Sequence, residues 1–316
     1  MEEVTLGWQK ELADAIVRVA GLIAKIIGMD IERVMESAGM ADKIAVALFS
    51  GKVKTASSPY ISAAVLLAFT GKDIAKERIR AVIERVGIRP DERLLDFAGA
   101  LRFRKEMAYA PALYFLRVVG KQTGRSDSVE NLMNVVGALG IEPDPDIAHR
   151  VIDIDSGRLK ARDAEMQKRL SEGITESASF LGGLMMTELS RVFEDRKIDA
   201  YVREGLVPHF SALGVLTFVG KNVDMENRLN VEGISKLLES VGLKLDNRMI
   251  EYILSIERFG VGPNVYVSAL SFLASVGEKP SVDGIMNIIE VLGIKGDSAV
   301  AGYVLIEYSK IVGTNG

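Results

Sequence analysis

The chain has 316 residues, 48% of them apolar and 26% charged, which is enough to bury a core in one large domain or two ordinary ones. Its 43 acidic and 39 basic side chains give a net charge of −4, which argues against a general polyanion-binding protein. The lack of cysteine excludes disulfides, thiolate metal sites and a cysteine nucleophile.

The N-terminal region carries no pattern typical of export or membrane insertion. The chain opens with two glutamates after Met1, the wrong charge for a signal peptide. Asp14, Arg18 and Lys25 interrupt the apolar run that follows, which therefore stays below the ~18 uninterrupted residues of a spanning helix. We expect a cytoplasmic protein with no membrane partner.

A leading helical region over residues 8–49 is followed by a three-helix segment over 60–101. Its first helix, from Tyr60 to Gly71, is rich in aromatic and aliphatic side chains and ends on glycine and lysine. Its second helix lies in residues 75–88, with apolar residues at the fifth, eighth, ninth and twelfth places and then Gly-Ile. This spacing predicts one apolar stripe along a helix.

The pattern of the second helix recurs three more times, at residues 128–141, 230–243 and 281–294. Ser128, Asn230 and Ser281 stand where N-cap residues belong, each with a carboxylate two residues on. The closing glycine of each block favours a left-handed C-cap. Internal repetition of this kind is typical of units that bury their apolar faces against neighbouring copies.

The complete repeat has about 45 residues and three helices. We call its four copies segments 1 to 4, at residues 60–101, 109–152, 209–256 and 266–308. A second leading region, over 160–200, matches the first with a constant offset, as in Ile16 with Ile174 and Arg33 with Arg191.

These matches predict an all-α protein of two homologous halves, residues 1–155 and 156–316. In each half, a leading helical region would accompany two consecutive segments packed as a pseudo-dimer, because three short helices bury too little surface alone. The polar stretch 153–157 is interpreted as the linker between the halves.

Segment 1 resembles the N-terminal dimerisation domain of archaeal and eukaryotic acidic ribosomal stalk proteins. The residues that carry the resemblance are Tyr60-Ile61, Ala63, Leu66-Leu67, Gly71-Lys72, Ile79, Val82, Ile83, Gly87-Ile88 and Asp91. In that family two domains pack as a dimer and clamp a helix of the stalk base protein. The resemblance implies that paired segments could clamp a helix here, although the family's acidic C-terminal tail is missing and factor recruitment is not implied.

No residue set typical of catalysis or cofactor binding stands out. His149 and His209, the only histidines, are interpreted as packing residues. The Gly-Lys pairs at 71–72, 120–121 and 220–221 lack the context of a phosphate-binding loop and are interpreted as helix C-caps. We expect no catalytic residue, cofactor or metal site.

Basic residues gather in the first part of the chain, twelve against six acidic ones from Lys52 to Lys105. Arg102, Arg104 and Lys105 cluster around Phe103. They are interpreted either as a solvated helical face or as a contact for RNA or another acidic partner.

The leading hypothesis is a non-catalytic helical scaffold that binds a partner helix in grooves between paired segments. The resemblance to stalk proteins implies an association with the translation apparatus. Whether the leading helices fill these grooves stays open, as does the oligomeric state. An alternative is an enzyme or small-molecule binder with a site between the halves, using Glu176, Glu188, Asp195 and Asp199. A third is RNA binding through segment 1.

Overall fold

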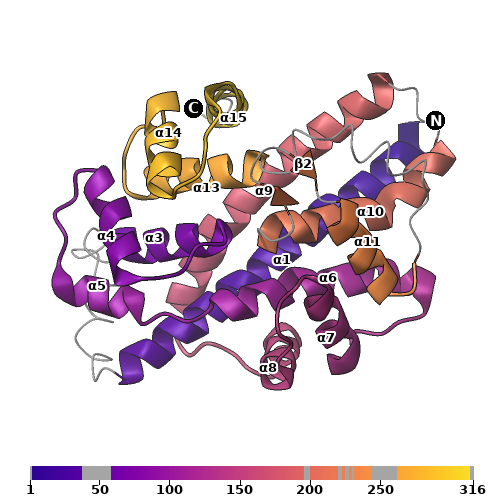
Figure 1. Ribbon diagram of the computed structural model, residues 1–316, viewed down its shortest axis with the longest axis horizontal. Helices are drawn as coiled ribbons and strands as arrows, with labels where there is room; N and C mark the ends of the chain where they lie inside the picture. Colours follow the sequence, from indigo (N-terminus) through magenta and orange to yellow (C-terminus); the bar gives the residue numbers. More distant parts are fainter. Residues whose placement is uncertain are drawn as a thin grey trace. The chain divides into compact units, whose positions relative to one another are not determined.

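The computed structural model describes residues 2–37, 58–195, 200–219, 223–224, 228–229, 231–243 and 262–313. Within these ranges the protein is helical apart from one pair of two-residue strands, which confirms the all-α class (Figure 1). The elements, in chain order, are α1 (Glu2–Ser37), α3 (Ser58–Phe69), α4 (Lys76–Arg85), α5 (Glu92–Gly99), α6 (Arg104–Thr123), α7 (Val129–Ala138), α8 (Pro145–Asp155), α9 (Ala164–Asp195), α10 (Ala200–Val219), β1 (Val223–Asp224), β2 (Arg228–Leu229), α11 (Val231–Ser240), α13 (Gly262–Ser275), α14 (Val282–Val291) and α15 (Ser298–Gly313).

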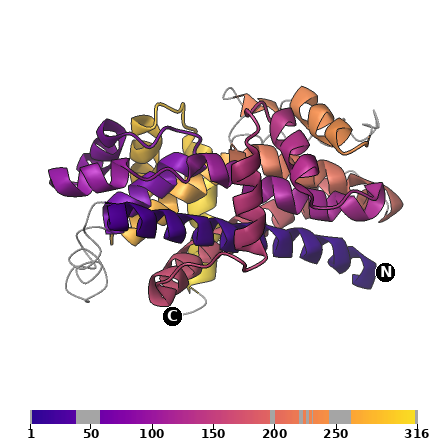
Figure 2. The same cartoon turned by 90° about the horizontal axis from the view of Figure 1, so that it is seen from below.

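The helices fall close to where the periodicity predicts them, although α6 begins at Arg104 and α10 at Ala200, before the expected starts at Tyr109 and His209. Segments 1, 2 and 4 each form three helices, α3–α5, α6–α8 and α13–α15, and segment 3 contributes α10 and α11. The expected third helix of segment 3, at 246–256, and the end of the first leading region, at 38–49, lie outside the described residues. Figure 2 shows α1 as one unbroken helix.

The second helix of each segment buries its predicted stripe. The side chains at the fifth, eighth and ninth places are at most 1% exposed in all four segments: Ile79, Val82, Ile83, Leu132, Val135, Val136, Ile234, Leu237, Leu238, Ile285, Ile288 and Ile289. Because a helix cannot cover its own apolar face, each of these four stripes packs against other helices and forms part of the core.

The caps predicted from Ser128, Ser281 and the closing glycines of the repeated second helix are confirmed. The Ser128 hydroxyl accepts a hydrogen bond from the Asn131 N–H at 3.2 Å, and Ser281 caps α14 in the same way. At the other end, Gly87 has a φ of 72°, and the next N–H, of Ile88, donates to the Ile83 carbonyl. This is the Schellman arrangement, and it also ends α7, α11 and α14. Asn230 lies outside the described residues.

The chain folds into two compact units that do not follow the expected division at residue 155. Unit 1 contains residues 2–23 of α1, helices α6–α8, residues 174–195 of α9, and α10, β1, β2 and α11. Unit 2 contains residues 24–37 of α1, helices α3–α5, residues 160–173 and helices α13–α15 from Pro263. The expected pairing of consecutive segments is therefore not confirmed, since unit 1 combines segments 2 and 3 and unit 2 combines segments 1 and 4.

In unit 1, the second helices of segments 2 and 3 meet, because α7 packs against α11. The N-terminal part of α1 packs against α9, where Gly182 allows a close approach. A Cβ atom at this glycine would lie 3.6 Å from the Cδ1 atom of Ile16.

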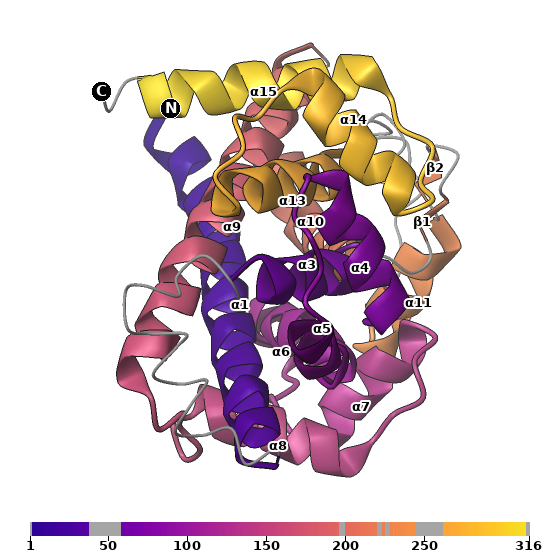
Figure 3. The same ribbon diagram turned by 90° about the vertical axis from the view of Figure 1, so that its left-hand side faces the viewer.

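In unit 2, the equivalent contact joins segments 1 and 4, because α4 packs against α14 (Figure 3). The Arg85 guanidinium donates to the Glu290 carboxylate at 2.6 Å and to the Asn287 side chain at 3.2 Å. Helices α3, α4 and α5 pack on one another, and α14 packs on α15.

The C-terminal part of α1 runs antiparallel to the start of α9 within unit 2. The Glu32 carboxylate accepts hydrogen bonds from the N–H groups of Arg162, at 3.0 Å, and Asp163, at 2.7 Å. One turn earlier, Gly28 leaves room for the side chain of Gln167, whose Oε1 atom would clash with a Cβ atom at residue 28. A carboxylate placed before the first turn of α9 also suits the positive end of the helix dipole.

Candidate functional site

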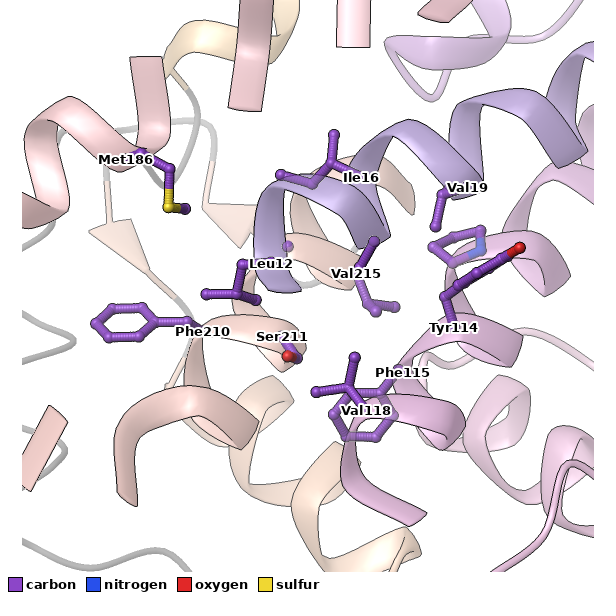
Figure 4. Close-up of a pocket in the computed structure, with 13 residues that line it drawn as sticks. Leu12, Ile16, Val19, Tyr114, Phe115, Val118, Met186, Phe210, Ser211 and Val215 are labelled. Carbon is purple, nitrogen blue, oxygen red and sulfur yellow. The ribbon is translucent and has the colours of Figure 1, made fainter. Parts of the chain in front are cut away.

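A small apolar cavity, partly open to solvent, lies in unit 1 between α1, α6, α9 and α10. It has a volume of about 50 Å³. Helix α1 lines it with Leu12, Ala15, Ile16 and Val19, which follow the i, i+3, i+4, i+7 spacing of one helix face (Figure 4). Leu12, Ile16 and Val19 are buried, whereas Asp14 on the same turns is exposed.

The facing wall comes from the first helices of segments 2 and 3. Phe115 and Val118 of α6 and Phe210 and Val215 of α10 line the cavity, and Met186 of α9 completes it (Figure 4). We call the part of α6 and α10 that lines this cavity the α6/α10 surface. Helix α1 forms the opposite wall of the cavity and faces this surface.

The two hydroxyl groups that line the cavity are engaged within the protein. Ser211 donates to the carbonyl of Val207, one turn earlier in α10, at 2.9 Å. Tyr114 donates to the carboxylate of Asp155, at the end of α8, at 3.2 Å. A lining of this kind offers apolar contact rather than polar groups that could bind or activate a substrate.

A charged cluster beside the cavity holds the ring of Tyr114. The Arg117 guanidinium lies 5.1 Å from the centre of that ring and forms ion pairs with Asp155, at 2.6 Å, and Asp127, at 2.9 Å. The hydrogen bond from Arg117 lowers the pKa of Asp127. Burial raises the pKa of Tyr114, and the nearby Asp155 carboxylate raises it further.

Asp155 was expected in a linker, and this interpretation needs correction. Residues 153–155 form the last turn of α8, and Asp155 is tied to α6 through Arg117 and Tyr114. The linker was expected because the stretch is polar, but a polar residue can close a helix when a partner lies on the neighbouring helix. A boundary of unit 1 does lie close by, at Leu159.

Of the predicted contact residues, Arg104 and Lys105 begin α6 and Arg102 lies in the turn before it. The Arg102 side chain donates to the carbonyl oxygens of Gly99 and Leu101, the latter at 3.1 Å. Its backbone N–H donates to the carboxylate of Asp30.

Asp30 is 1% exposed and also forms an ion pair with Arg33. Arg104 donates to the carbonyl of Gly71 at 2.6 Å and forms an ion pair with Asp73. Arg102 and Arg104 therefore hold the loops of unit 2 together, while Lys105 is exposed.

Other basic residues of segment 1 are matched by carboxylates of the same segment. Lys76 and Arg80, on α4, form ion pairs with Glu92, on α5, at 3.1 and 2.7 Å. The hydrogen bond from Arg80, and to a smaller extent the one from Lys76, lowers the pKa of Glu92. These carboxylates are among the six acidic residues of the region from Lys52 to Lys105, so the ion pairs leave its net positive charge unchanged but engage the side chains of Lys76 and Arg80 within the protein.

The structure describes only some of the remaining candidates. His209 is 5% exposed in α10, as a packing residue would be, whereas His149 lies exposed on α8. Of the acidic residues proposed for an enzyme site, Glu176 is exposed on α9. The side chains of Glu188 and Asp195, and the whole of Asp199, lie outside the described residues.

The Gly-Lys pairs prove to be unlike one another. Gly71 has a φ of 71° and ends the first helix of segment 1, as predicted. Gly120 is inside α6, which continues to Thr123 and is followed by Gly124 with a φ of 67°, so the prediction of a C-cap at Gly120 is wrong. The pair at 220–221 lies outside the described residues.

Comparison with protein-family models, curated proteins and solved structures finds no match for this chain. Over the described part of the chain, no group of three or more histidine or acidic side chains is placed to hold a metal ion. None of the helices that the structure describes is both long and apolar enough to cross a membrane.

The α1 side chains at the cavity were not among the site residues predicted from the sequence. Their signal is nevertheless present, because Leu12, Ala15, Ile16 and Val19 form an amphipathic stripe within residues 8–49. The stripe predicts a buried face but does not say which helices bury it.

Proposed function

We propose that the protein is a non-catalytic helical interaction protein that holds a partner helix in an apolar groove between the first helices of two paired segments. The observation that carries this proposal is the cavity of unit 1, where α6 and α10 face a helix through aliphatic and aromatic side chains. An amphipathic helix in an apolar groove is a common mode of protein recognition, read through anchors at i, i+3, i+4 and i+7.

The pairing of the segments supports the proposal. In each unit the same helix of two different segments makes the mutual contact, α7 with α11 and α4 with α14. Contact between equivalent elements is the pattern of a twofold-related, isologous interface. We infer that each unit is a covalent pseudo-dimer, formed by segments 2 and 3 or by segments 1 and 4, from two halves that arose by duplication.

The resemblance of segment 1 to ribosomal stalk dimerisation domains agrees with this function. In that family a pair of such domains clamps a helix of another protein. By the same resemblance, we propose the translation apparatus, in the cytoplasm, as the setting in which a partner helix would be met.

A display library of helical peptides, selected against the full-length chain, tests the proposed function. We expect selected peptides to carry aliphatic residues at i, i+3 or i+4, and i+7, and to become helical when bound. Their affinity should change little with salt, because the contacts are apolar. Failure to select any helical peptide would contradict the proposal, and RNA binding that weakens steeply with salt would favour the alternative reading of segment 1.

A further inference from the structure

We propose that α1 is an exchangeable occupant of the α6/α10 surface, and that a partner helix docks there by displacing residues 2–20 of α1. This inference rests on the proposed function and identifies the partner by its chemistry. The partner is an amphipathic helix with an aliphatic face like that of Leu12, Ala15, Ile16 and Val19, and with a polar opposite face.

The first argument is that α1 fits its place imperfectly. A cavity of about 50 Å³ remains where α1 meets α6, α9 and α10, and its walls are apolar. The cavity is a partly open recess beside α1, in which apolar side chains of the wall stay in contact with solvent. An occupant with larger side chains at the positions of Ala15 or Val19 could fill this space and bind more tightly than α1 does.

The second argument is a weak point in α1 at the boundary of the unit. Gly21 lies in the interior of the helix, and a Cβ atom at this position would meet nothing within 4 Å. No close packing therefore requires glycine here, in contrast to Gly28, where Gln167 occupies the space. Glycine in a helix interior favours the non-helical chain. Gly21 lies two residues before Ile23, the last residue of α1 that belongs to unit 1.

The experiment uses the full-length chain and a fluorescent peptide with the sequence of residues 2–23 as the probe. Binding to the wild-type chain should be weak, because the surface is open only in a small fraction of molecules. Ile16→Ala weakens the resident helix and leaves the α6/α10 surface unchanged, so it should tighten binding of the wild-type peptide about tenfold or more. Asp14→Ala, at an exposed position of the same helix, is the matched control and should bind as the wild type does.

A reversible lock tests the same point in the opposite direction. A Cβ atom at Gly182 would lie 3.9 Å from the Cγ2 atom of Ile16, so Ile16→Cys with Gly182→Cys places two thiols within reach of a disulfide. Because the chain has no cysteine of its own, this disulfide would be the only one. The oxidised protein should lose peptide binding at least tenfold, and reduction should restore it.

The inference would be overturned if the peptide bound the oxidised and reduced proteins with equal affinity. It would also be overturned if the peptide bound Ile16→Ala and the wild type equally, since the peptide would then bind somewhere other than the α6/α10 surface. So would a lack of binding to every variant. Val19→Ala, a smaller truncation, replaces Ile16→Ala if circular dichroism shows that the latter is unfolded. Library peptides that bind without displacing α1 would contradict this inference but leave the proposed function intact. Failure of the inference can therefore be distinguished from failure of the proposed function.

Discussion

The hydroxyl oxygen of Tyr109 accepts a hydrogen bond from the backbone N–H of Asp144 at 2.7 Å. Tyr109 is on the first helix of segment 2, and Asp144 is the N-cap residue of the third, where its carboxylate accepts the N–H groups of Asp146 and Ile147. The tyrosine therefore fixes the start of α8 against α6. Tyr60 with Asp91, at 2.8 Å, and Tyr266 with Asp297, at 2.6 Å, repeat this bond in segments 1 and 4.

Removing this hydroxyl should destabilise the fold. Tyr109→Phe leaves the Asp144 N–H without its acceptor, and we expect a loss of about 1–3 kcal/mol in the free energy of unfolding, measured by urea titration. Tyr114→Phe is the control, because its partner Asp155 keeps the ion pair with Arg117. A loss at Tyr109 no larger than that at Tyr114 would contradict the role given to the repeated bond.

The partly buried Tyr114 predicts that the stability of the fold decreases at alkaline pH. Burial raises the pKa of Tyr114 above its ordinary value of about 10, so the folded protein retains a proton that the unfolded chain releases. The stabilisation is fully present below about pH 10 and is lost as the pH rises through the higher folded-state pKa. The stability gap between the wild type and Tyr114→Phe should therefore narrow above pH 10.

Tyrosinate absorbance measures this pKa directly. The tyrosinate absorbance of the folded wild type and of folded Tyr114→Phe is measured as the pH is raised. The difference between the two curves reports Tyr114 alone, and we expect it to develop above pH 10. A difference that titrates at or below pH 10 would show that the fold does not shield the Tyr114 hydroxyl from solvent.

The pairing of segments 1 and 4 can be tested through Arg85 and Glu290, which are 205 residues apart in the chain. We expect Arg85→Glu to destabilise the protein and the added substitution Glu290→Arg to recover part of the loss. The coupling should be about 0.2–1 kcal/mol, because both side chains are largely solvated, and it should shrink at high salt. A double-mutant cycle from urea unfolding measures it, and purely additive effects would argue against contact between α4 and α14.

Gly21→Ala should strengthen α1. The substitution meets no neighbouring atom, and alanine is favoured over glycine in a helix interior by about 1 kcal/mol, so the free energy of unfolding should rise by about that amount. The same free energy should lower the apparent affinity of the full-length chain for the peptide of residues 2–23 about fivefold, because α1 is then harder to displace.

Gly183→Ala on α9 is its matched control, since it is exposed and also has nothing within 4 Å of the added Cβ atom. This variant should be stabilised equally without any change in exchange. An identical change in peptide affinity for both variants would mean that the effect does not come from α1.

The helices and their ends could be predicted from the sequence because both depend on local chemistry. Ser128 and Ser281 cap helices through N–H groups three residues away, and Gly87 ends α4 through its own backbone conformation. The error at Gly120 has a similar local cause, since glycine also occurs inside a helix where backbone approaches closely. An added Cβ there would lie 2.5 Å from the Arg125 carbonyl oxygen.

The partners of the segments could not be predicted, because the four apolar stripes are nearly alike and local periodicity does not distinguish one pairing from another. What separates them is long-range: Arg85 meets Glu290, and α1 supplies different residues to each unit. The roles of Arg102 and Arg104 were missed for a related reason. Their acceptors include backbone carbonyls and the remote carboxylate of Asp30, which a charge count does not reveal.

Photo-crosslinking from the α6/α10 surface tests most directly whether α1 lies on it. A photo-leucine at position 118, in place of a half-buried valine that lines the cavity, reacts with whatever lies within a few ångströms. Peptide mapping of the irradiated full-length chain should then find crosslinks to residues 12–19 of α1. Crosslinks that reach other parts of the chain but never α1 would contradict the account.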